Sequence, residues 1–295
     1  MLKYRKIYYS LSALLVVASI SFFFIFGLKF GIDFRGGSLM QLKFVSSSVP
    51  SSESIQSALE GLSLGDIVIQ STGKSGVILR FVDIDESLHQ SMLVRLEALG
   101  QFEEERFESI GPVIGEETKQ KAIWAIILVL IMILVYVAWA FRKISYPLGS
   151  WVYGLVALVT LFHDVLITIG VFVLLGHILK IEVGVPFVAA LLTILGYSVN
   201  DTIVVFDRIR ENILKRGGEF DFGNIIDRAI KQTYVRSTNT SLTTFFVLAA
   251  IFLFGGVTIK YFVLTLMIGV AVGTYSSIFL ASPLLFSIYL LKFRK

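Results

Sequence analysis

The sequence predicts an α-helical polytopic membrane protein, with six transmembrane helices and a small α+β, ferredoxin-like extracytoplasmic domain between the first and the second. Three observations lead to this fold class. Six apolar segments are long enough to cross a bilayer, and one polar, acidic stretch separates the first from the other five. The composition is that of a membrane protein, with 55% hydrophobic residues, 25 Phe and only 16% charged residues, and a mean hydropathy of +0.80.

The first apolar segment is expected to be an uncleaved membrane anchor. Lys3, Arg5 and Lys6 precede it, as in a signal peptide, but the apolar stretch continues from Ile7 to Phe30 and no small-x-small cleavage site follows. Each of the other five segments is expected to span the membrane once. The six spans are predicted at about 8–28, 122–141, 148–176, 183–206, 237–257 and 261–291.

The charges predict how the chain is oriented. Basic residues gather in every second loop, and the positive-inside rule places these loops and both termini in the cytoplasm. The opposite loops between the later spans carry only Lys180, Glu182 and Lys260. These loops account for the net charge of +4, so it indicates no nucleic-acid partner. The cytoplasmic set consists of Lys3, Arg5, Lys6, Arg142, Lys143, Arg208, Arg210, Lys215, Arg216, Arg228, Lys231, Lys292, Arg294 and Lys295.

The polar segment 29–118 is predicted to fold as a separate extracytoplasmic domain. It holds 14 of the 22 acidic residues and only 7 basic ones. Alternating apolar residues predict strands, and amphipathic stretches predict helices, in the order βαββαβ of the split-βαβ, ferredoxin-like arrangement. Asp83 and Glu86 are expected to cap the second helix. The elements are expected at 39–45, 52–62, 66–72, 76–82, 85–99 and 101–110.

The chain is therefore expected to have three parts. A cytoplasmic N-terminus and the first transmembrane helix occupy 1–28, and the extracytoplasmic α+β domain occupies 29–118. Residues 119–295 form a five-helix transmembrane region with a cytoplasmic loop at 207–236 and a cytoplasmic C-terminus.

Soluble-enzyme chemistry has little support in the sequence. The chain has no Cys, which excludes disulfides, thiolate metal sites and cysteine nucleophiles. The three His (His89, His163 and His177) are too scattered to predict a zinc site. Neither a GxxxxGK[ST] phosphate loop nor a GxSxG motif occurs. We therefore expect no enzyme activity, no metal and no cofactor.

Asp201 is the most informative residue, because it lies inside a predicted span. It is seven residues before Arg208, or roughly 10 Å deep at about 1.5 Å of rise per residue. A charge at that depth costs at least a few kcal/mol and normally faces a partner or a hydrated cavity. Arg236, in the polar run RSTNTSLTT at 236–244, is the expected partner. The pair is interpreted as a proton-coupled switch, and a permanent ion pair between two helices is the alternative.

Four other polar residues are candidates for the same path. His163 and Asp164 lie together near the middle of the third span, where an imidazole next to an acid could extend a proton path. They could equally form hydrogen bonds to another helix. Asn200 and Asn239 flank the Asp201 and Arg236 positions and carry the same two interpretations, proton path or structural contact.

Glycines are expected to set close contacts at two places. Gly269 and Gly273, continued by Ser277, put a small residue at every fourth position of the last span, which predicts close helix packing, with a channel wall as the alternative.

The second glycine group lies where the first span ends. Asp33 stands between Gly31 and the Gly36–Gly37 pair, and this cluster predicts a tight turn that joins the membrane to the domain.

Together these motifs resemble the SecF subunits of the SecDF accessory complex of bacterial protein export, which is related to the resistance-nodulation-division transporters. The resemblance covers nearly the whole chain, and its most specific part is the block LGYSVNDTIVVFDRIREN. The matching segments are GIDFRGG (31–37), SIGPVIGEETKQKA (109–122), FHDVLITIG (162–170), LGYSVNDTIVVFDRIREN (195–212), RSTNTSLTT (236–244) and GVAVGTYSSIFLASP (269–283).

The resemblance implies a multi-pass protein of the bacterial inner membrane that assembles with SecD and works with the SecYEG channel. Such a complex uses the proton-motive force to help unfolded precursor proteins through, after the ATP-driven action of SecA. The coupling ion is then the proton, and Asp201 and Arg236 match the charged positions implicated in proton transport in that family.

Two other functions stay open. A half-unit of a proton-driven small-molecule exporter would use the same charged pair, but its extracytoplasmic domain is usually far larger than about 90 residues. A non-coupled assembly scaffold would tolerate neutralisation of Asp201 with a change in stability and no loss of activity.

Overall fold

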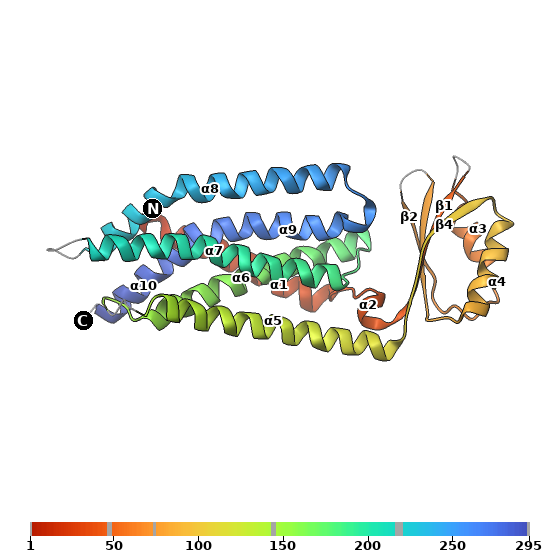
Figure 1. Cartoon of the computed structure of the whole chain (residues 1–295), viewed down its shortest axis with the longest axis horizontal. Helices are drawn as coiled ribbons and strands as arrows, with labels where there is room; N and C mark the ends of the chain where they lie inside the picture. The colour runs from red at the N-terminus through yellow and green to blue at the C-terminus, as the bar shows by residue number, and fades with distance from the viewer. Residues whose placement is uncertain (1, 46–48, 73–74, 143–145, 216–220, 294–295) are drawn as a thin grey trace. The chain divides into compact units, whose positions relative to one another are not determined.

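The computed structural model describes residues 2–45, 49–72, 75–142, 146–215 and 221–293. Of the basic loop residues used above, Lys143, Arg216, Arg294 and Lys295 lie outside the described residues. The chain divides into two compact units, one of residues 1–29 with 124–295 and one of residues 30–123. The first unit is a helical bundle, and the second is a small sheet domain (Figure 1).

The described part of the chain contains six helical segments that are long and apolar enough to cross a membrane, which confirms the predicted number. A short 3-10 turn (Leu2–Tyr4) precedes the first helix, and a π-helical segment interrupts the last span. The helices are α1 (Arg5–Phe26), α5 (Pro112–Ala140), α6 (Ser150–Leu179), α7 (Val185–Leu214), α8 (Phe222–Phe254), α9 (Val257–Ser276) and α10 (Ser282–Phe293), with the π-helical segment η2 (Ser277–Ala281) between the last two.

Three helices are longer than the apolar segments that predicted them. α5 begins at Pro112, α7 continues to Leu214 and α8 begins at Phe222, whereas the apolar segments began at 122, ended at 206 and began at 237. Charged residues with high helix propensity continue each helix beyond its apolar part. In α5, for example, the Lys121 ammonium lies 3.0 Å from the Glu117 carboxylate one turn earlier. Hydropathy therefore marks only the part of each helix expected inside the membrane.

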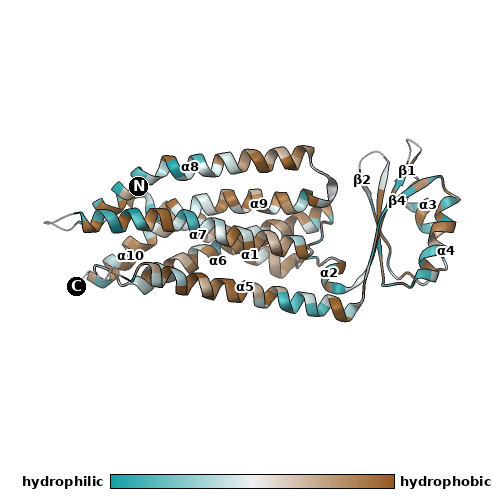
Figure 2. Cartoon of the chain, in the orientation of Figure 1, coloured by the Kyte–Doolittle hydropathy of each residue, from teal (hydrophilic) through white to brown (hydrophobic). Residues whose placement is uncertain are grey.

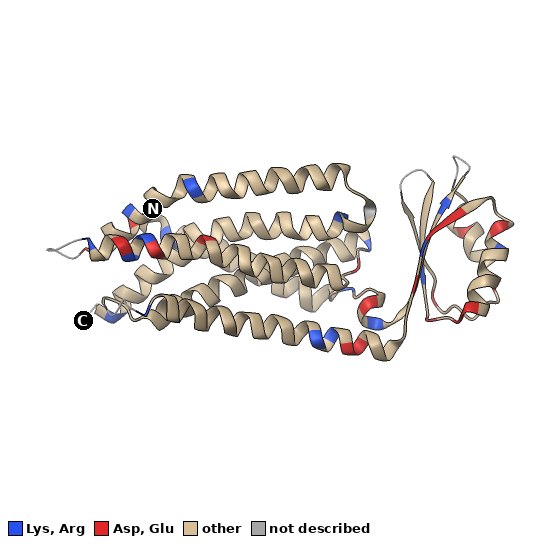
Figure 3. Cartoon of the chain, viewed as in Figure 1, with Lys and Arg blue, Asp and Glu red and all other residues tan. Residues whose placement is uncertain are grey.

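The core of the bundle consists of α6, α7 and α9. α9 packs against α6, α7 and α8, and α1 packs against α6. In the most apolar stretch of each helix, the share of buried residues is 56% in α6 and 50% in α7. It is only 11% in each of α1, α5 and α8. In Figure 2, most of α5 and the second half of α8 are coloured as hydrophobic residues. Figure 3 shows that charged residues of the bundle concentrate toward the helix ends. A membrane environment accounts for apolar side chains on the outside of the bundle.

The sheet domain has the predicted βαββαβ order. A one-turn helix, α2 (Ile32–Arg35), is followed by β1 (Gly37–Phe44), α3 (Ser52–Ala58), β2 (Val68–Thr72), β3 (Gly76–Phe81), α4 (Glu86–Glu97) and β4 (Phe102–Ile110). The strand order is β2-β3-β1-β4, and all neighbouring strands are antiparallel. This is the ferredoxin-like arrangement, so the prediction is confirmed.

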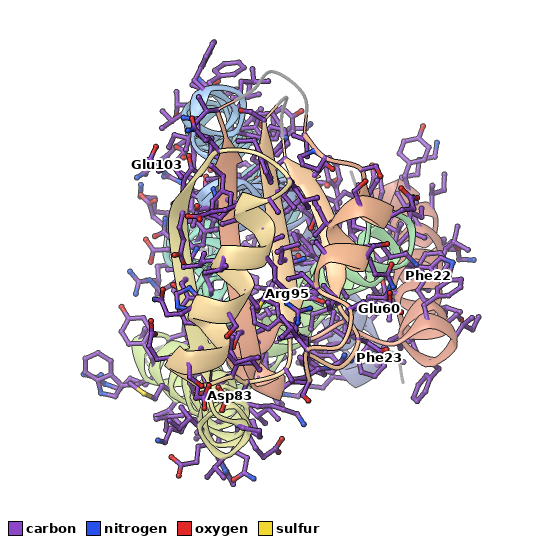
Figure 4. All side chains as sticks on the ribbon, turned by 90° about the vertical axis from the view of Figure 1, so that its right-hand side faces the viewer. Phe22, Phe23, Glu60, Asp83, Arg95 and Glu103 are labelled. Atoms are coloured by element: carbon purple, nitrogen blue, oxygen red, sulfur yellow. The ribbon has the colours of Figure 1, made fainter. Side chains whose placement is uncertain are left out.

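The domain has its own hydrophobic core. Alternate residues of β1 (Met40, Leu42 and Phe44) are buried, as the period of two predicts. They pack with residues of the other elements, including Met92 and Leu96 of α4. The Arg95 guanidinium donates a hydrogen bond of 2.7 Å to the backbone oxygen of Glu60, and Figure 4 labels both residues. This bond ties α4 to the segment that follows α3.

The N-cap of α4 differs from the predicted one. Asp85, and not Asp83, is the N-cap, because its carboxylate accepts a hydrogen bond of 2.9 Å from the backbone N–H of Leu88. The Asp83 carboxylate instead accepts a bond of 2.5 Å from the Ser109 hydroxyl of β4. Asp85 immediately precedes Glu86, the first residue of α4, so it is the acid placed to cap the helix, and Asp83 lies two residues too early.

The predicted turn after the first span contains α2, with Asp33 in its only turn. Gly36 and Gly37 follow it with φ of 77° and 124°, a region that favours glycine. A Cβ on Gly36 would lie 2.6 Å from the Pro112 Cα, and a Cβ on Gly37 would lie 2.7 Å from the Phe81 backbone oxygen. Both positions therefore combine a positive φ with a close backbone approach.

Candidate functional site

Asp201 is a buried acid of α7. Its side chain is only 5% exposed, and its Oδ2 atom has no hydrogen-bond partner among the described residues. Ser237 of α8 lies next to it, is 1% exposed, and likewise has a hydroxyl without a partner in the described part of the chain. The Ser237 hydroxyl is placed to donate to this carboxylate, so a small movement of α8 against α7, or a proton on Asp201, can satisfy both groups.

Arg236 lies one residue before Ser237, and its side chain is exposed. The helices α7 and α8 are neighbours, and the guanidinium is near enough to interact electrostatically with Asp201. However, the described ion pairs, defined at 4.0 Å or less, do not include Arg236 with Asp201. The structure thus brings the two predicted residues onto adjacent helices without a direct salt bridge.

Asp164 is the most completely buried acid, with no exposed surface. Its Oδ1 lies 2.9 Å from Nδ1 of His163. Its Oδ2 accepts hydrogen bonds from the hydroxyl of Ser198 on α7 at 2.5 Å and from that of Ser276 at the end of α9 at 2.8 Å. One carboxylate therefore connects α6, α7 and α9, the three helices of the bundle core.

His163 completes this group. Its side chain is 5% exposed, and Nε2 has no partner among the described residues. The ring is roughly parallel to that of Tyr275, at 26° and 6.3 Å between centroids. The Tyr275 hydroxyl in turn lies 3.2 Å from the Ser12 hydroxyl of α1 and donates to the Tyr8 backbone oxygen at 3.1 Å.

A second set of hydroxyls connects α7, α8 and α9. Ser241 of α8 receives a hydrogen bond of 2.6 Å from Thr274 and one of 3.3 Å from Tyr197. Ser241 is one turn after Ser237 on the same helix, and both are buried. Polar side chains of α8 therefore continue from the Asp201 neighbourhood toward α9.

Glycines allow the helices to approach closely at this site. A Cβ on Gly273 of α9 would lie 3.0 Å from the Ser198 Cβ, and one on Gly269 would overlap the Ile194 side chain of α7. Both predicted packing glycines therefore face α7. Ser276, which donates to Asp164, is three residues after Gly273 and depends on this close approach.

The polar run 236–244 noted in the sequence contains Ser237 and Ser241, but the two serines that bind Asp164, Ser198 and Ser276, were missed. Ser198 lies three residues before Asp201, a spacing that places both on one helix face, so the sequence contained this signal. Ser276 is followed by the π-helical segment, which no pattern in the sequence predicted. Asn200 and Asn239 are exposed, and the structure does not bring them into the group around Asp201.

The arrangement contains two buried carboxylates, one imidazole and several hydroxyls, which are groups that can donate or accept protons and hydrogen bonds. Among the described residues, no group of three or more His, Asp or Glu side chains has the geometry to hold a metal ion.

Comparison with known proteins identifies the family. Residues 91–290 match the family described as "Protein export membrane protein SecD/SecF, C-terminal", and residues 21–47 match the "SecD/SecF GG Motif". The first match contains Asp164, Asp201 and Arg236, and the second contains Gly36 and Gly37.

Individual relatives agree. The chain is 43% identical to "Protein translocase subunit SecF" of Thermobaculum terrenum over 97% of this chain and 92% of that protein. It is 40% identical to "Protein translocase subunit SecF" of Sebaldella termitidis over 99% of this chain and 91% of that one.

The fold also matches a solved structure, the crystal structure of SecDF from Thermus thermophilus. The TM-score is 0.84 at 31% identity, and the match covers 97% of this chain and 38% of that one. The chain thus corresponds to less than half of that SecDF protein. It belongs to the SecD/SecF family of protein-export membrane proteins, as a SecF subunit of the Sec protein translocase.

Proposed function

We propose that the chain, assembled with SecD, uses the proton-motive force to complete the translocation of unfolded precursor proteins through SecYEG, after the ATP-driven action of SecA. Asp201 is the coupling acid in this proposal, and Arg236 is its cationic partner. The observation that carries the proposal is the buried Asp201 carboxylate, whose Oδ2 meets no hydrogen-bond donor at bonding distance among the described residues, beside the buried Ser237 hydroxyl and near the Arg236 guanidinium.

The two protonation states of Asp201 favour different surroundings. The ionised carboxylate is attracted to the Arg236 guanidinium, and an uncompensated charge in the bundle is costly. The neutral carboxyl is less costly to bury in the present surroundings, and it no longer attracts the Arg236 guanidinium. Because α7 carries one group and α8 the other, uptake and release of a proton would change which arrangement of the two helices is stable.

The energy available is sufficient for such a step. One elementary charge that crosses about 100 mV releases roughly 2.3 kcal/mol. Since about 1.4 kcal/mol changes an equilibrium tenfold, this biases a two-state rearrangement by some tens-fold. Repeated cycles could then make the movement of an emerging polypeptide directional.

The test is export of a secreted precursor into membrane vesicles that contain the chain and SecD, with and without a proton gradient. Asp201→Asn removes the titrating group and keeps the side-chain volume. We expect it to abolish the gradient-dependent late step and to leave the ATP-driven step intact. The matched control is Asp207→Asn on the same helix, because the Asp207 carboxylate is half exposed and lies 2.6 Å from Arg210.

The outcomes separate the coupled machine from the scaffold. If Asp201→Asn at matched abundance exports normally and keeps its gradient dependence, the carboxylate is structural and proton coupling through it is wrong. A loss in both variants would indicate a general defect of α7 and would also contradict the assignment to Asp201.

A further inference from the structure

We propose that Asp164 and His163 form a second proton-exchange site of the bundle, in which the Asp164 carboxyl holds the proton and the His163 imidazole passes it on. This inference rests on the proposed function, because a second site has a role only in a proton-coupled bundle. It goes beyond that function by assigning a residue pair that neither the Asp201 nor the Arg236 interpretation uses.

The hydrogen bonds of Asp164 fit an ionised carboxylate. An ionised carboxylate only accepts hydrogen bonds, and Asp164 has Ser198, Ser276 and His163 within 2.9 Å of its two oxygens. When the carboxyl takes up a proton, one oxygen gains an O–H donor and both oxygens accept more weakly, so these three hydrogen bonds weaken or rearrange. The partners lie on α7 and at the end of α9, so the change acts at the junction of three helices.

His163 supplies a second, independent observation. While Nδ1 donates to Asp164, Nε2 carries a lone pair, and this atom is buried without a partner among the described residues. An imidazole in this state can accept a proton at Nε2 and release the Nδ1 proton to the carboxylate. This exchange moves one proton from one side of the ring to the other without any other group.

Further polar groups lie on two sides of this pair. On one side, the Tyr275 ring lies beside His163, and its hydroxyl contacts Ser12 and the Tyr8 backbone in the first half of α1. That half of α1 follows the basic residues that predict a cytoplasmic end.

On the other side, Ser198 connects Asp164 to the buried face of α7 that also carries Asp201. Ser198 is three residues further than Asp201 from the basic end of α7, so Asp164 lies deeper in the bundle than the proposed coupling acid, on the side away from the predicted cytoplasmic loop.

The charged and titratable groups near Asp164 are few. Its own helix contributes His163, α7 contributes Asp201 and Tyr197, α9 contributes Tyr275 and α1 contributes Tyr8. Of the described residues, His163 alone forms an ion pair with it. If Asp164 served only to hold the helices together, a neutral amide at this position would be sufficient. A proton-exchange site requires a carboxyl group.

Infrared difference spectroscopy of the complex with SecD in lipid, titrated with pH, tests this directly. Protonation of a buried carboxyl adds a carbonyl band, and we expect Asp164→Asn to remove one band and Asp201→Asn to remove another. Asp164→Glu keeps a titrating acid and should move the first band. Ser276→Ala removes one of the hydrogen bonds to Asp164 and should shift the midpoint of that band. In the export assay, we expect Asp164→Asn to lower the gradient-dependent step at least tenfold and Asp164→Glu to restore part of it.

His163→Gln tests the relay separately. It keeps a side-chain amide that can donate to Asp164, but it cannot exchange protons. We expect the Asp164 band to remain, and gradient-dependent export to fall, because the acid then loses its path.

Specific outcomes would overturn the proposal. Infrared spectra of Asp164→Asn and Asp164→Glu that match the wild type would show that Asp164 does not titrate. If Asp164→Asn does not assemble, the Asp164→Glu spectrum still decides. If Asp201→Asn abolishes coupling while Asp164→Asn keeps it, this inference fails and the proposed function stands. If neither variant changes coupling, the proposed function itself fails.

Discussion

Three aspartates of the bundle have different surroundings, although the sequence presents all of them in helices. Asp164 is fully buried and accepts bonds from two hydroxyls, and Asp201 is 5% exposed with an unpartnered oxygen. Asp207, by contrast, is half exposed and pairs with Arg210 at the end of the same helix as Asp201. At the scale of residues, burial and partners therefore decide which acid can couple to a proton and which is an ordinary surface charge.

Gly273→Ala should destabilise the bundle by about 1–3 kcal/mol, because the added Cβ would lie 3.0 Å from the Ser198 Cβ and push α9 away from α7. Gly196→Ala on α7 is the control, since a Cβ there has no atom within 4 Å. It should be neutral or stabilise the helix by up to about 1 kcal/mol. Thermal unfolding of the purified complex with SecD measures both variants.

The same pair of variants checks the packing interpretation. Equal melting temperatures for the two variants would show that α9 can move without cost, contrary to the contact seen at Ser198.

At the scale of elements, helix ends are set by local hydrogen bonds more than by hydropathy. The N-cap of α4 is the clearest case. The Asp85 carboxylate accepts bonds from the Leu88 N–H and from the Ser87 hydroxyl, each at 2.9 Å, and the backbone bond to Leu88 is the main reason that the pKa of Asp85 lies below its ordinary value. A lowered pKa means that the ionised carboxylate stabilises the folded helix.

This cap predicts a pH dependence for the domain. The stabilisation by Asp85 should be complete above the ordinary aspartate pKa of about 4 and be lost as pH falls through the lower folded-state pKa. Asp85→Ala should increase amide exchange in the first turn of α4 at neutral pH. The same substitution should also remove the loss of stability that protonation of Asp85 causes at low pH.

Hydrogen exchange of the whole chain, followed by mass spectrometry, measures the effect. The control is Asp66→Ala, which removes an equal charge from an exposed position outside the regular elements. Similar exchange in α4 for the two variants would mean that net charge, and not the cap, controls this helix.

At the scale of the whole molecule, the orientation in the membrane can be tested with single cysteines, since the chain has none of its own. Lys215 follows α7 in the basic loop predicted to be cytoplasmic, and Gly256 precedes α9 in a loop predicted to face the outside; both are exposed. In spheroplasts, we expect an impermeant maleimide to label Gly256→Cys at once and Lys215→Cys only after permeabilisation. The reverse pattern would contradict cytoplasmic termini.

Much of the architecture follows from the sequence alone. Apolar segments longer than a bilayer needs predict six spans, and period-two alternation predicts the strands of the domain, because both patterns reflect local burial. Asp201 was recognisable for the same reason, as a charge where the local pattern demands an apolar residue. The GG pair was recognisable because a positive φ favours glycine.

The tertiary structure decided what depends on contacts between distant segments. Ser198 and Ser276 are ordinary serines in the sequence, and each becomes a hydrogen-bond donor to Asp164 only where α7 and α9 pack against α6. The absence of a direct Asp201–Arg236 ion pair among the described residues depends in the same way on packing. Sequence patterns report the surroundings of each residue along its own helix or strand, whereas hydrogen bonds between helices depend on how those helices pack in three dimensions.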